Sequence, residues 1–467
     1  MIHTQVMELW MALSPAEHKK VLLFLDNALH NQRKDVQLLA KLLADTAPDA
    51  YPGLDKRTLF AQIVPEKPYD NLQMNYICSF LAQRLEAYFV WAEMESEAFW
   101  RDYLLIRAFR RRGINANFLR KTDKAIQTLE QQPLRNGLYH LICYLIERER
   151  YEYRVLYDRE TPTDLSRVTE PLQHFFALEN LRWAGTALSL KARYGVQNDW
   201  AFYVPVLEYA ASTQEAETPE IVLMHLGFKT MLDTENEENF KSLKSLISAN
   251  DHVFNAGEKR DIYLLAINFC LRRHNRGERP FYTLEALDLY REALKRDLFI
   301  ENNHLQKYTY NNIVRLACIA GEWDWAKDFL ETYQSRLAED ERENIYKFNL
   351  ASWHYLSGDY SRVPALLQTF EFADRDTQLN ARQMLLRSFF ELEEWPALDS
   401  LLRSFYSFLR RRDDIGYQRI SYLNLIKFTR KLMSGPFNRK KAMLLRDRIE
   451  KEQYVAERAW LLEKLNR

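Results

Sequence analysis

Three short stretches decide the fold: GEWDWA at residues 321–326, GDYSRV at 358–363 and EEWPAL at 393–398. Each places a tight turn before an aromatic residue and a small or aliphatic residue three positions after that aromatic. Four residues further on every copy has a leucine, and three residues beyond the leucine every copy has an aromatic side chain. Equivalent positions recur at intervals of 37 and 35 residues. A unit that repeats at such a period is typical of stacked arrays of supersecondary structure.

Six side chains define this unit, and core packing is the role we expect for all of them. The aromatic positions are Trp323, Tyr360 and Trp395, and the small or aliphatic positions are Ala326, Val363 and Leu398. We expect each aromatic residue to wedge between two antiparallel helices. The residue three positions later should let those helices approach closely, so that each pair buries one face on its neighbour. Upstream, residues 286–294 have the same spacing as the second helix of the unit.

These units resemble tetratricopeptide repeats, in which a Gly-x-aromatic turn precedes a helix with small and aromatic residues on its inner face. The resemblance covers residues 310–406 well and 262–296 less closely. It implies a right-handed α-solenoid of antiparallel helix pairs. Three features differ from the family pattern: Val363 and Leu398 replace the usual alanine, Pro396 directly follows the third aromatic residue, and the spacings exceed the usual period of about 34 residues. The chain as a whole also looks like uncharacterised helical proteins that recur in bacterial genomes, a likeness that implies no activity.

The rest of the sequence predicts an all-α protein. Glycine (12) and proline (14) are scarce in 467 residues, and no run alternates as a β-strand would. The helix after Ser14 begins with a capping box, because Glu17 stands three residues after the serine. We expect four parts: a small N-terminal helical head at 1–95, divergent helical repeats at 96–260, clearer repeats at 261–406 and basic helices at 407–467. The head is better explained as a cap on the first repeat than as an independent helix-turn-helix-type module.

Cysteine usage and hydropathy predict a cytoplasmic location and no membrane partner. The cysteines are widely spaced, which excludes the usual metal-ligand spacings and favours buried, reduced thiols. They are Cys78, Cys143, Cys270 and Cys318. The N-terminal residues lack the pattern of a signal peptide. The longest apolar runs are far shorter than the roughly 20 residues that a spanning helix needs.

The sequence contains none of the common catalytic motifs. It lacks a dinucleotide fingerprint, a phosphate-binding loop, a nucleophile elbow and a zinc-protease helix. The histidines are scattered, and the clusters of carboxylates look like exposed loops or first helical turns. We therefore expect no catalytic, cofactor-binding or metal-binding residues and no cofactor. An enzyme whose site is assembled from dispersed helix positions stays an alternative.

The leading hypothesis is a protein–protein interaction scaffold that holds a partner peptide or helix in the concave groove of the array. The tetratricopeptide resemblance implies that Asn, Lys and Arg on the first helix of each pair make the contacts. The matching positions are Asn311, Asn312, Arg315, Lys347 and Asn349. The identity of the protein partner does not follow from the sequence.

Nucleic-acid binding is the second hypothesis, and it depends on the C-terminal segment. Residues 401–467 contain 17 lysines and arginines against 7 acidic residues, although the whole chain has 65 of each sign. Aromatic residues interleave with these cations at Tyr417, Tyr422, Phe428 and Phe437, as a surface that stacks single-stranded bases would require. The simpler interpretation is that the cations are solvated or compensated within the chain, and the aromatics lie in the core.

Overall fold

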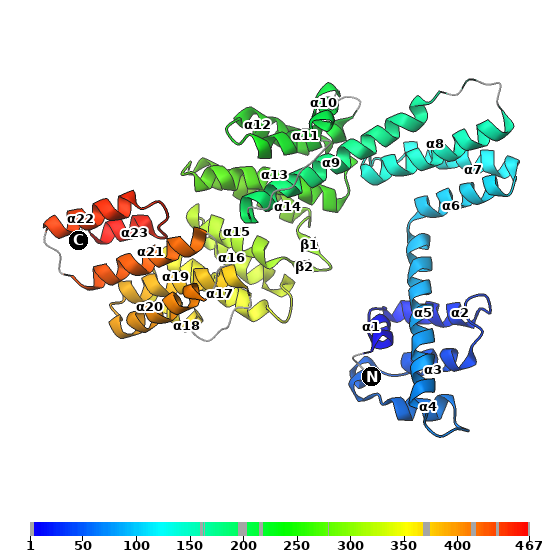
Figure 1. The fold of residues 1–467 in the computed structure, drawn as a ribbon, viewed down its shortest axis with the longest axis horizontal. Helices are drawn as coiled ribbons and strands as arrows, with labels where there is room; N and C mark the ends of the chain where they lie inside the picture. The colour runs from blue at the N-terminus through cyan, green and yellow to red at the C-terminus, as the bar shows by residue number, and fades with distance from the viewer. Residues whose placement is uncertain are drawn as a thin grey trace. The chain divides into compact units, whose positions relative to one another are not determined.

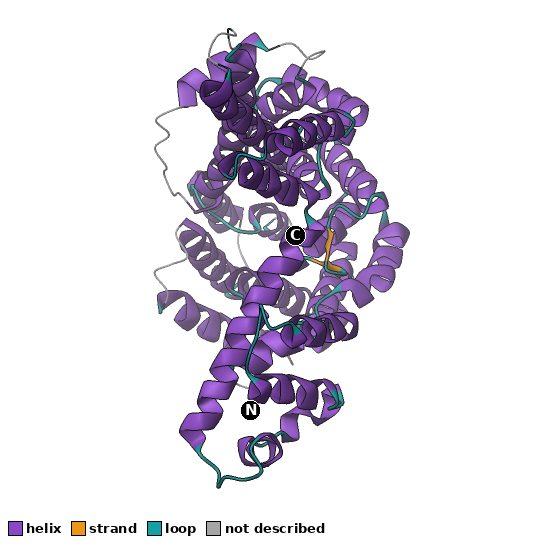
Figure 2. Cartoon of the chain, turned by 90° about the vertical axis from the view of Figure 1, so that its right-hand side faces the viewer, coloured by secondary structure: helices purple, strands orange, loops and turns teal. Residues whose placement is uncertain are grey.

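The protein is all-α apart from one short hairpin. The computed structural model describes residues 4–158, 162, 164–194, 203–213, 218–278, 280–367, 374–411, 417–435 and 439–465. Throughout these residues the chain forms helices joined by short connections (Figures 1 and 2). The strands found there, β1 (Ile300–Glu301) and β2 (His304–Leu305), pair antiparallel with Ile300 opposite Leu305. No helix in the described ranges combines the length and the apolar character that crossing a bilayer requires.

The chain divides into two compact units, Met1–Glu179 and Asn180–Arg467, and the division falls within helix α9 (Ser166–Tyr194). This division neither tests nor replaces the four parts expected from the sequence, whose boundaries stay predictions. The first unit contains α1 (Gln5–Met11), α2 (Pro15–Asp26), α3 (Lys34–Ala44), the 3-10 helix η1 (Pro48–Gly53), α4 (Lys56–Ile63), α5 (Asn71–Ser96), α6 (Ala98–Arg111), α7 (Asn115–Glu130) and α8 (Gly137–Tyr157).

The first unit has two separate groups of buried apolar side chains. One group joins α1 to α5 and runs from Val6 to Tyr88. The other joins α6, α7 and α8 through Ile106, Phe118 and Ile142. The predicted capping box is present at the start of α2: the Glu17 N–H donates to the Ser14 hydroxyl, and the Ser14 N–H donates to the Glu17 carboxylate.

In the second unit, helices pack on their neighbours along the chain. Its helices are α10 (Tyr203–Ser212), α11 (Pro219–Leu232), α12 (Glu237–Asn250), η2 (Asp251–Val253), α13 (Ala256–Asn275), α14 (Phe281–Lys295), α15 (Lys307–Ile319), α16 (Trp323–Tyr333), η3 (Gln334–Arg336), α17 (Arg342–Ser357), η4 (Tyr360–Arg362), α18 (Val363–Leu367), α19 (Arg375–Glu391), α20 (Trp395–Arg410), α21 (Tyr417–Met433), α22 (Arg439–Lys451) and α23 (Arg458–Lys464). The first helix of a pair packs on its own second helix, as α15 does on α16 and α19 on α20. First helices also contact the next first helix, as α15 does α17 and α17 does α19.

The three repeat turns share one backbone conformation. Gly321, Gly358 and Glu393 all have positive φ, at 81°, 85° and 58°. In each turn the next N–H donates to the carbonyl five residues back: Glu322 to Ala317, Asp359 to His354 and Glu394 to Phe389, all at 2.9 Å. This is the Schellman ending of a helix, which favours glycine because a left-handed residue with a Cβ is strained. The third copy reaches the same turn with a glutamate.

The repeat-defining positions fall into two classes of burial. Ala326, Val363 and Leu398 are each 0% exposed on the second helices. The aromatic residues occupy the first position of α16, η4 and α20, where a helix begins near the surface. Trp395 is 41% exposed and packs edge-on against Phe390, with the ring centroids 5.4 Å apart. It therefore covers the end of the pair and is less enclosed than the expected wedge. Phe370, the aromatic position of the second copy, lies outside the described residues.

The four cysteines carry free thiols. Cys78, Cys270 and Cys318 are buried, whereas Cys143 is only partly buried, so the expectation of four buried thiols is wrong for this residue. Burial raises the pKa of Cys143 to about 11 and that of Cys318 to about 12. These thiols therefore stay protonated at neutral pH and are poor nucleophiles.

Candidate functional site

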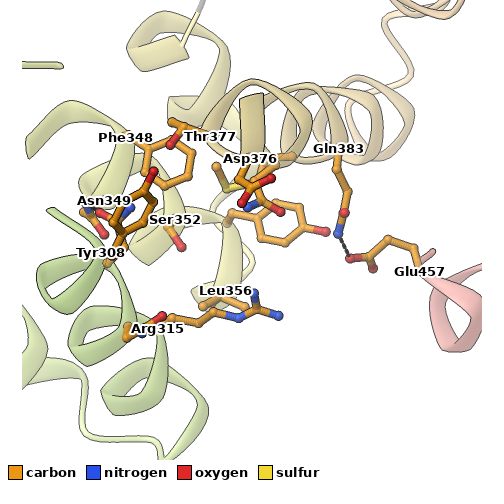
Figure 3. A pocket seen from close by; sticks show the side chains of 15 residues that line it. Tyr308, Arg315, Phe348, Asn349, Ser352, Leu356, Asp376, Thr377, Gln383 and Glu457 are labelled. Carbon is orange, nitrogen blue, oxygen red and sulfur yellow. Dashed lines mark hydrogen bonds between the residues drawn. The ribbon is translucent and has the colours of Figure 1, made fainter. Parts of the chain in front are cut away.

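A pocket of about 330 Å³ lies across the first helices of the three clearest repeat units (Figure 3). We call it the inner pocket. It is lined by side chains from α15, α17 and α19 and by Glu457, which directly precedes α23. The lining positions on each helix are spaced by three or four residues, so they form one stripe per helix. Tyr308, Asn311, Asn312 and Arg315 make the stripe on α15.

Four of the five residues expected to bind a partner line the inner pocket: Asn311, Asn312, Arg315 and Asn349. Lys347 does not, and its ammonium group pairs with Glu343 one turn earlier on α17. The difference follows from helical geometry, because Lys347 and Asn349 are two positions apart and so point to different sides of α17.

The asparagines are partly used in holding the helices together. Asn349 is 1% exposed, and its Nδ2 donates to Asn311 Oδ1 at 2.6 Å and to the Ile345 carbonyl at 2.8 Å. This bond joins the first helices of two successive pairs. Asn312 Nδ2 donates to the Tyr290 hydroxyl at 3.4 Å. The Asn311 amide, by contrast, donates no hydrogen bond to any described residue, so its N–H groups are available to a ligand.

Arg315 is the free cation of the inner pocket. Its side chain is exposed, and it makes no hydrogen bond or ion pair with the residues that the structure describes. Figure 3 shows the guanidinium reaching from α15 toward Leu356. The carboxylates nearby are already paired: Asp376 with Arg375, and Glu457 with Arg387. An unpaired arginine beside compensated acids favours a ligand with a carboxylate or another anionic group.

The stripe on α19 was not predicted from the sequence. It consists of Asp376, Thr377, Asn380, Gln383 and Met384. The signal was present, because these positions have the same three- and four-residue spacing as the α15 stripe and belong to the first helix of the next unit but one. Without the packing of α15 on α17 and of α17 on α19, nothing showed that this particular face of α19 lines a pocket.

The floor of the pocket is apolar but contains one unsatisfied hydroxyl. Phe348 and Met384 are 7% and 6% exposed. Tyr355 is also 7% exposed, and its hydroxyl oxygen is buried without a hydrogen-bond partner in the described structure. Burial is the main cause that raises the pKa of Tyr355, so the hydroxyl keeps its proton at neutral pH. Glu457 and Arg387 are the charged groups beside this hydroxyl, and both also act on its pKa.

Glu457 closes one end of the inner pocket from far along the chain. Gln383 Nε2 donates to Glu457 Oε1 at 2.5 Å, as drawn in Figure 3, and Arg387 donates to Oε2 at 2.9 Å. Helix α23 is fixed beyond it, because the Trp460 indole N–H and the Lys464 ammonium group both donate to Glu391. Burial alone would raise the pKa of Glu391, but these two hydrogen bonds together with the charges of Lys464 and Arg387 outweigh it and lower the pKa.

The chemistry of the inner pocket is recognition by hydrogen bonds. Its described lining has no histidine or cysteine, so it lacks the ligands that transition metals prefer and the usual base for a nucleophile. Amide donors, one free guanidinium and an apolar floor are instead suited to a polar chain with an acidic group.

The basic C-terminal segment is partly compensated within the chain. Lys464 pairs with Glu391, and Arg458 donates to backbone carbonyls at the end of α22 and just beyond it. Tyr422 and Phe428 are 9% and 0% exposed, so these two aromatics are in the core and cannot stack on bases. The side chains of Tyr417 and Phe437, the other two aromatics of the nucleic-acid hypothesis, lie outside the described residues.

Comparison with protein-family models, with curated proteins and with solved structures found no match to this chain.

Proposed function

We propose that the protein is an interaction scaffold, in which tetratricopeptide-like helix pairs stack as a right-handed α-solenoid and the inner pocket holds a segment of a partner protein. The observation that carries this proposal is the inner pocket itself. It lies on the first helices of three successive pairs, the side that lines the concave groove of such an array.

The partner segment we propose has an acidic side chain flanked by backbone that needs hydrogen bonds. Arg315 would pair with the acidic group, and the free Asn311 amide and the Tyr355 hydroxyl would bond to polar atoms of the segment. Phe348 and Met384 would take an apolar side chain next to it. Because Asn349 already joins α15 to α17, the pocket is largely preformed, which lowers the entropy cost of binding.

The test is affinity capture from the source cells with the full-length protein and two charge-reversal variants. Arg315→Glu reverses the free cation of the inner pocket. Lys327→Glu on α16 is the matched control, because Lys327 is an exposed cation outside the pocket and has no ion pair in the described structure. We expect a specific set of proteins to be lost with Arg315→Glu and retained with Lys327→Glu.

A third variant, Lys347→Glu, asks whether the wider inner face takes part. Loss of the same proteins with Lys347→Glu would extend the binding surface beyond the pocket. Nuclease treatment before capture separates a protein partner from a nucleic-acid bridge. Identical capture by the wild type and by a correctly folded Arg315→Glu variant would refute the proposal.

A reducing, cytoplasmic location is part of this proposal. It is supported by the free state of the four thiols.

A further inference from the structure

A second polar depression lies on another side of α19, away from the inner pocket residues. It has a volume of about 700 Å³ and is lined by Arg382 of α19 together with a stripe on α20. We call it the arginine hollow. The stripe comprises Ser400, Arg403, Ser404, Ser407 and Phe408, spaced by three or four residues along one face of the helix, and it continues to Arg411, the residue directly after α20.

Arg382 is the unusual residue of the arginine hollow. Several described arginines have a buried Nε atom without a hydrogen-bond partner, namely Arg84, Arg148, Arg273, Arg382, Arg387 and Arg419. The others bond through the rest of the guanidinium or make another interaction in the chain. Arg382 itself has neither a hydrogen bond nor an ion pair within the described residues.

The position of Arg382 is fixed even though its charge is not compensated. Its guanidinium lies over the Phe408 ring, with Cζ 4.5 Å from the ring centroid. Burial lowers the pKa of Arg382, and no carboxylate acts in the opposite direction. A stacked, partly buried guanidinium has lost much of its hydration and presents its remaining N–H groups in a fixed direction. This preorganisation favours an anion with several acceptor oxygens.

The charges around the arginine hollow leave a net positive excess. Arg403 pairs with Asp399, and both side chains are largely exposed. Arg411 is exposed and has no partner in the part of the chain that the structure describes. Among the described residues, the three guanidinium groups are thus offset by one carboxylate, that of Asp399, and two of them have no carboxylate partner there.

Serine hydroxyls supply the neutral donors. Ser404 donates to the Leu401 carbonyl at 3.0 Å, as serines on helices often do. Ser400 and Ser407 make no hydrogen bond with described residues, so their hydroxyls are free to donate. Two free hydroxyls beside three guanidinium groups match the oxygens of a tetrahedral anion.

We propose that the arginine hollow binds the phosphate group of a phosphate monoester. A monoester carries close to two negative charges at neutral pH and three terminal oxygens, which match the charge excess and the donors. A phosphodiester, as in a nucleic acid, carries one charge per phosphate and fits less well. This site is independent of the inner pocket and of the partner segment proposed for it.

The test is calorimetric titration of the full-length protein at low ionic strength with inorganic phosphate and with N-acetyl-O-phosphoserine amide. Arg382→Met keeps a flexible side chain on the Phe408 ring but removes the guanidinium. We expect it to weaken binding about tenfold or more, since a charge-assisted hydrogen bond typically contributes that much. Arg382→Lys keeps the charge without the planar fork and should lose less affinity.

The matched control is Arg57→Met. Arg57 is an exposed arginine of α4 in the first unit, its guanidinium lies 5.5 Å from the Tyr69 ring centroid, and it does not line the hollow. We expect the affinity of this variant to stay within about twofold of the wild type, because it removes one exposed surface charge outside the hollow. Circular dichroism checks that each variant folds. If Arg382→Met does not fold, Arg411→Met at the exposed end of α20 takes its place, and it too must weaken binding.

The two ligands distinguish the source of the phosphate. Tighter binding of the phosphoserine amide supports a phosphorylated partner or metabolite, and equal binding supports free phosphate. Absence of saturable binding of either ligand in the millimolar range, or unchanged affinity in folded Arg382→Met and Arg411→Met, would overturn the proposal. Tighter binding of a short single-stranded oligonucleotide than of the monoester would overturn the choice of a monoester.

Discussion

The inner pocket and the arginine hollow share helix α19 but differ in how their charged side chains are paired. On the pocket side, Asp376 and Glu457 are both paired within the chain, and one arginine, Arg315, is left free. On the hollow side, Arg382 is held in place without an acidic partner among the residues that the structure describes. One helix therefore presents a surface of directed hydrogen bonds to one side and a surface of uncompensated positive charge to the other.

The difference indicates how each site can be selective. Hydrogen bonds from fixed amides depend on the shape of the ligand and little on salt. An excess of guanidinium charge attracts any anion, and binding is tighter for an anion that pairs with more of the N–H donors. Salt screens this attraction, so the affinity falls as the ionic strength rises. The predictions below test whether the two sides of α19 are as distinct as this contrast implies.

The largest expected effect comes from a substitution that removes packing on which both sites depend. Leu398 is 0% exposed and belongs to the core cluster that α20 shares with α19. Leu398→Ala should lower the free energy of unfolding by about 3 kcal/mol, because it deletes buried methyl groups and leaves a cavity. Chemical denaturation measures this loss. Leu401→Ala, at a partly buried position of the same helix, is the control and should cost clearly less. Equal losses would mean that α20 is not anchored through Leu398.

The next effect sharpens the contrast between paired and exposed charges. Glu457 and Arg387 are 17% and 24% exposed, and their ion pair closes the inner pocket. Glu457→Gln should destabilise the protein by about 2 kcal/mol, because it leaves a largely buried guanidinium without its counter-charge. Arg403→Ala breaks the exposed pair with Asp399 beside the arginine hollow and should change stability by less than about 0.5 kcal/mol. Thermal melting of both variants measures this difference. Equal shifts in the two melting temperatures would contradict the contrast between paired and exposed charges.

Lowering the pH tests the effect of burial on two histidines of the second unit. Burial lowers the pKa of His225 and of His354 from the ordinary value of 6.5. Below that pH the unfolded chain binds protons at these histidines that the folded chain does not bind. The free energy of unfolding therefore has its full value above about pH 6.5 and decreases as the pH falls. The decrease is at most about 1.4 kcal/mol per pH unit for each histidine. Denaturation at several pH values should show a shallower loss in a His225→Gln/His354→Gln variant. His304→Gln, at an exposed position, should keep the wild-type slope. An unchanged slope in the double variant would contradict the assignment.

The smallest effects concern the turns that set the helix pairs in register. Gly358→Ala places a Cβ on a residue with φ of 85° and should destabilise the protein by about 1 kcal/mol. Glu393→Gly relieves the same strain at φ of 58°, just before α20 and the arginine hollow, and should stabilise by about 0.5 kcal/mol. Opposite signs in paired melting curves are the expected result. If Glu393→Gly lowers the melting temperature, the Glu393 side chain stabilises the protein by more than its backbone strain destabilises it.

The sequence predicted the all-α class, the helix starts and the turns much better than it predicted the sites. The capping box at Ser14 and the turns at Gly321 and Gly358 are present because their hydrogen bonds join residues at most five apart. Of the predicted partner-binding residues, four line the inner pocket and Lys347 does not. The stripe on α19 and the closing residue Glu457 were missed, since Glu457 is 74 residues from Gln383 in the chain.

Local interactions depend on residues that are close in the sequence. The amino-acid sequence by itself therefore determined where the second helices of the repeat units begin and which residues turn the chain. It also determined that Ala326, Val363 and Leu398 are core residues. Only the tertiary structure decided that Arg315 and Arg382 have no ion-pair partner among the described residues. Lys347, Arg315 and Arg382 are similar in sequence, each a cation on the first helix of a pair. The first has a neighbour of opposite charge on its own helix, whereas the other two face side chains brought from different helices. The availability of a charged group is set by packing between distant segments.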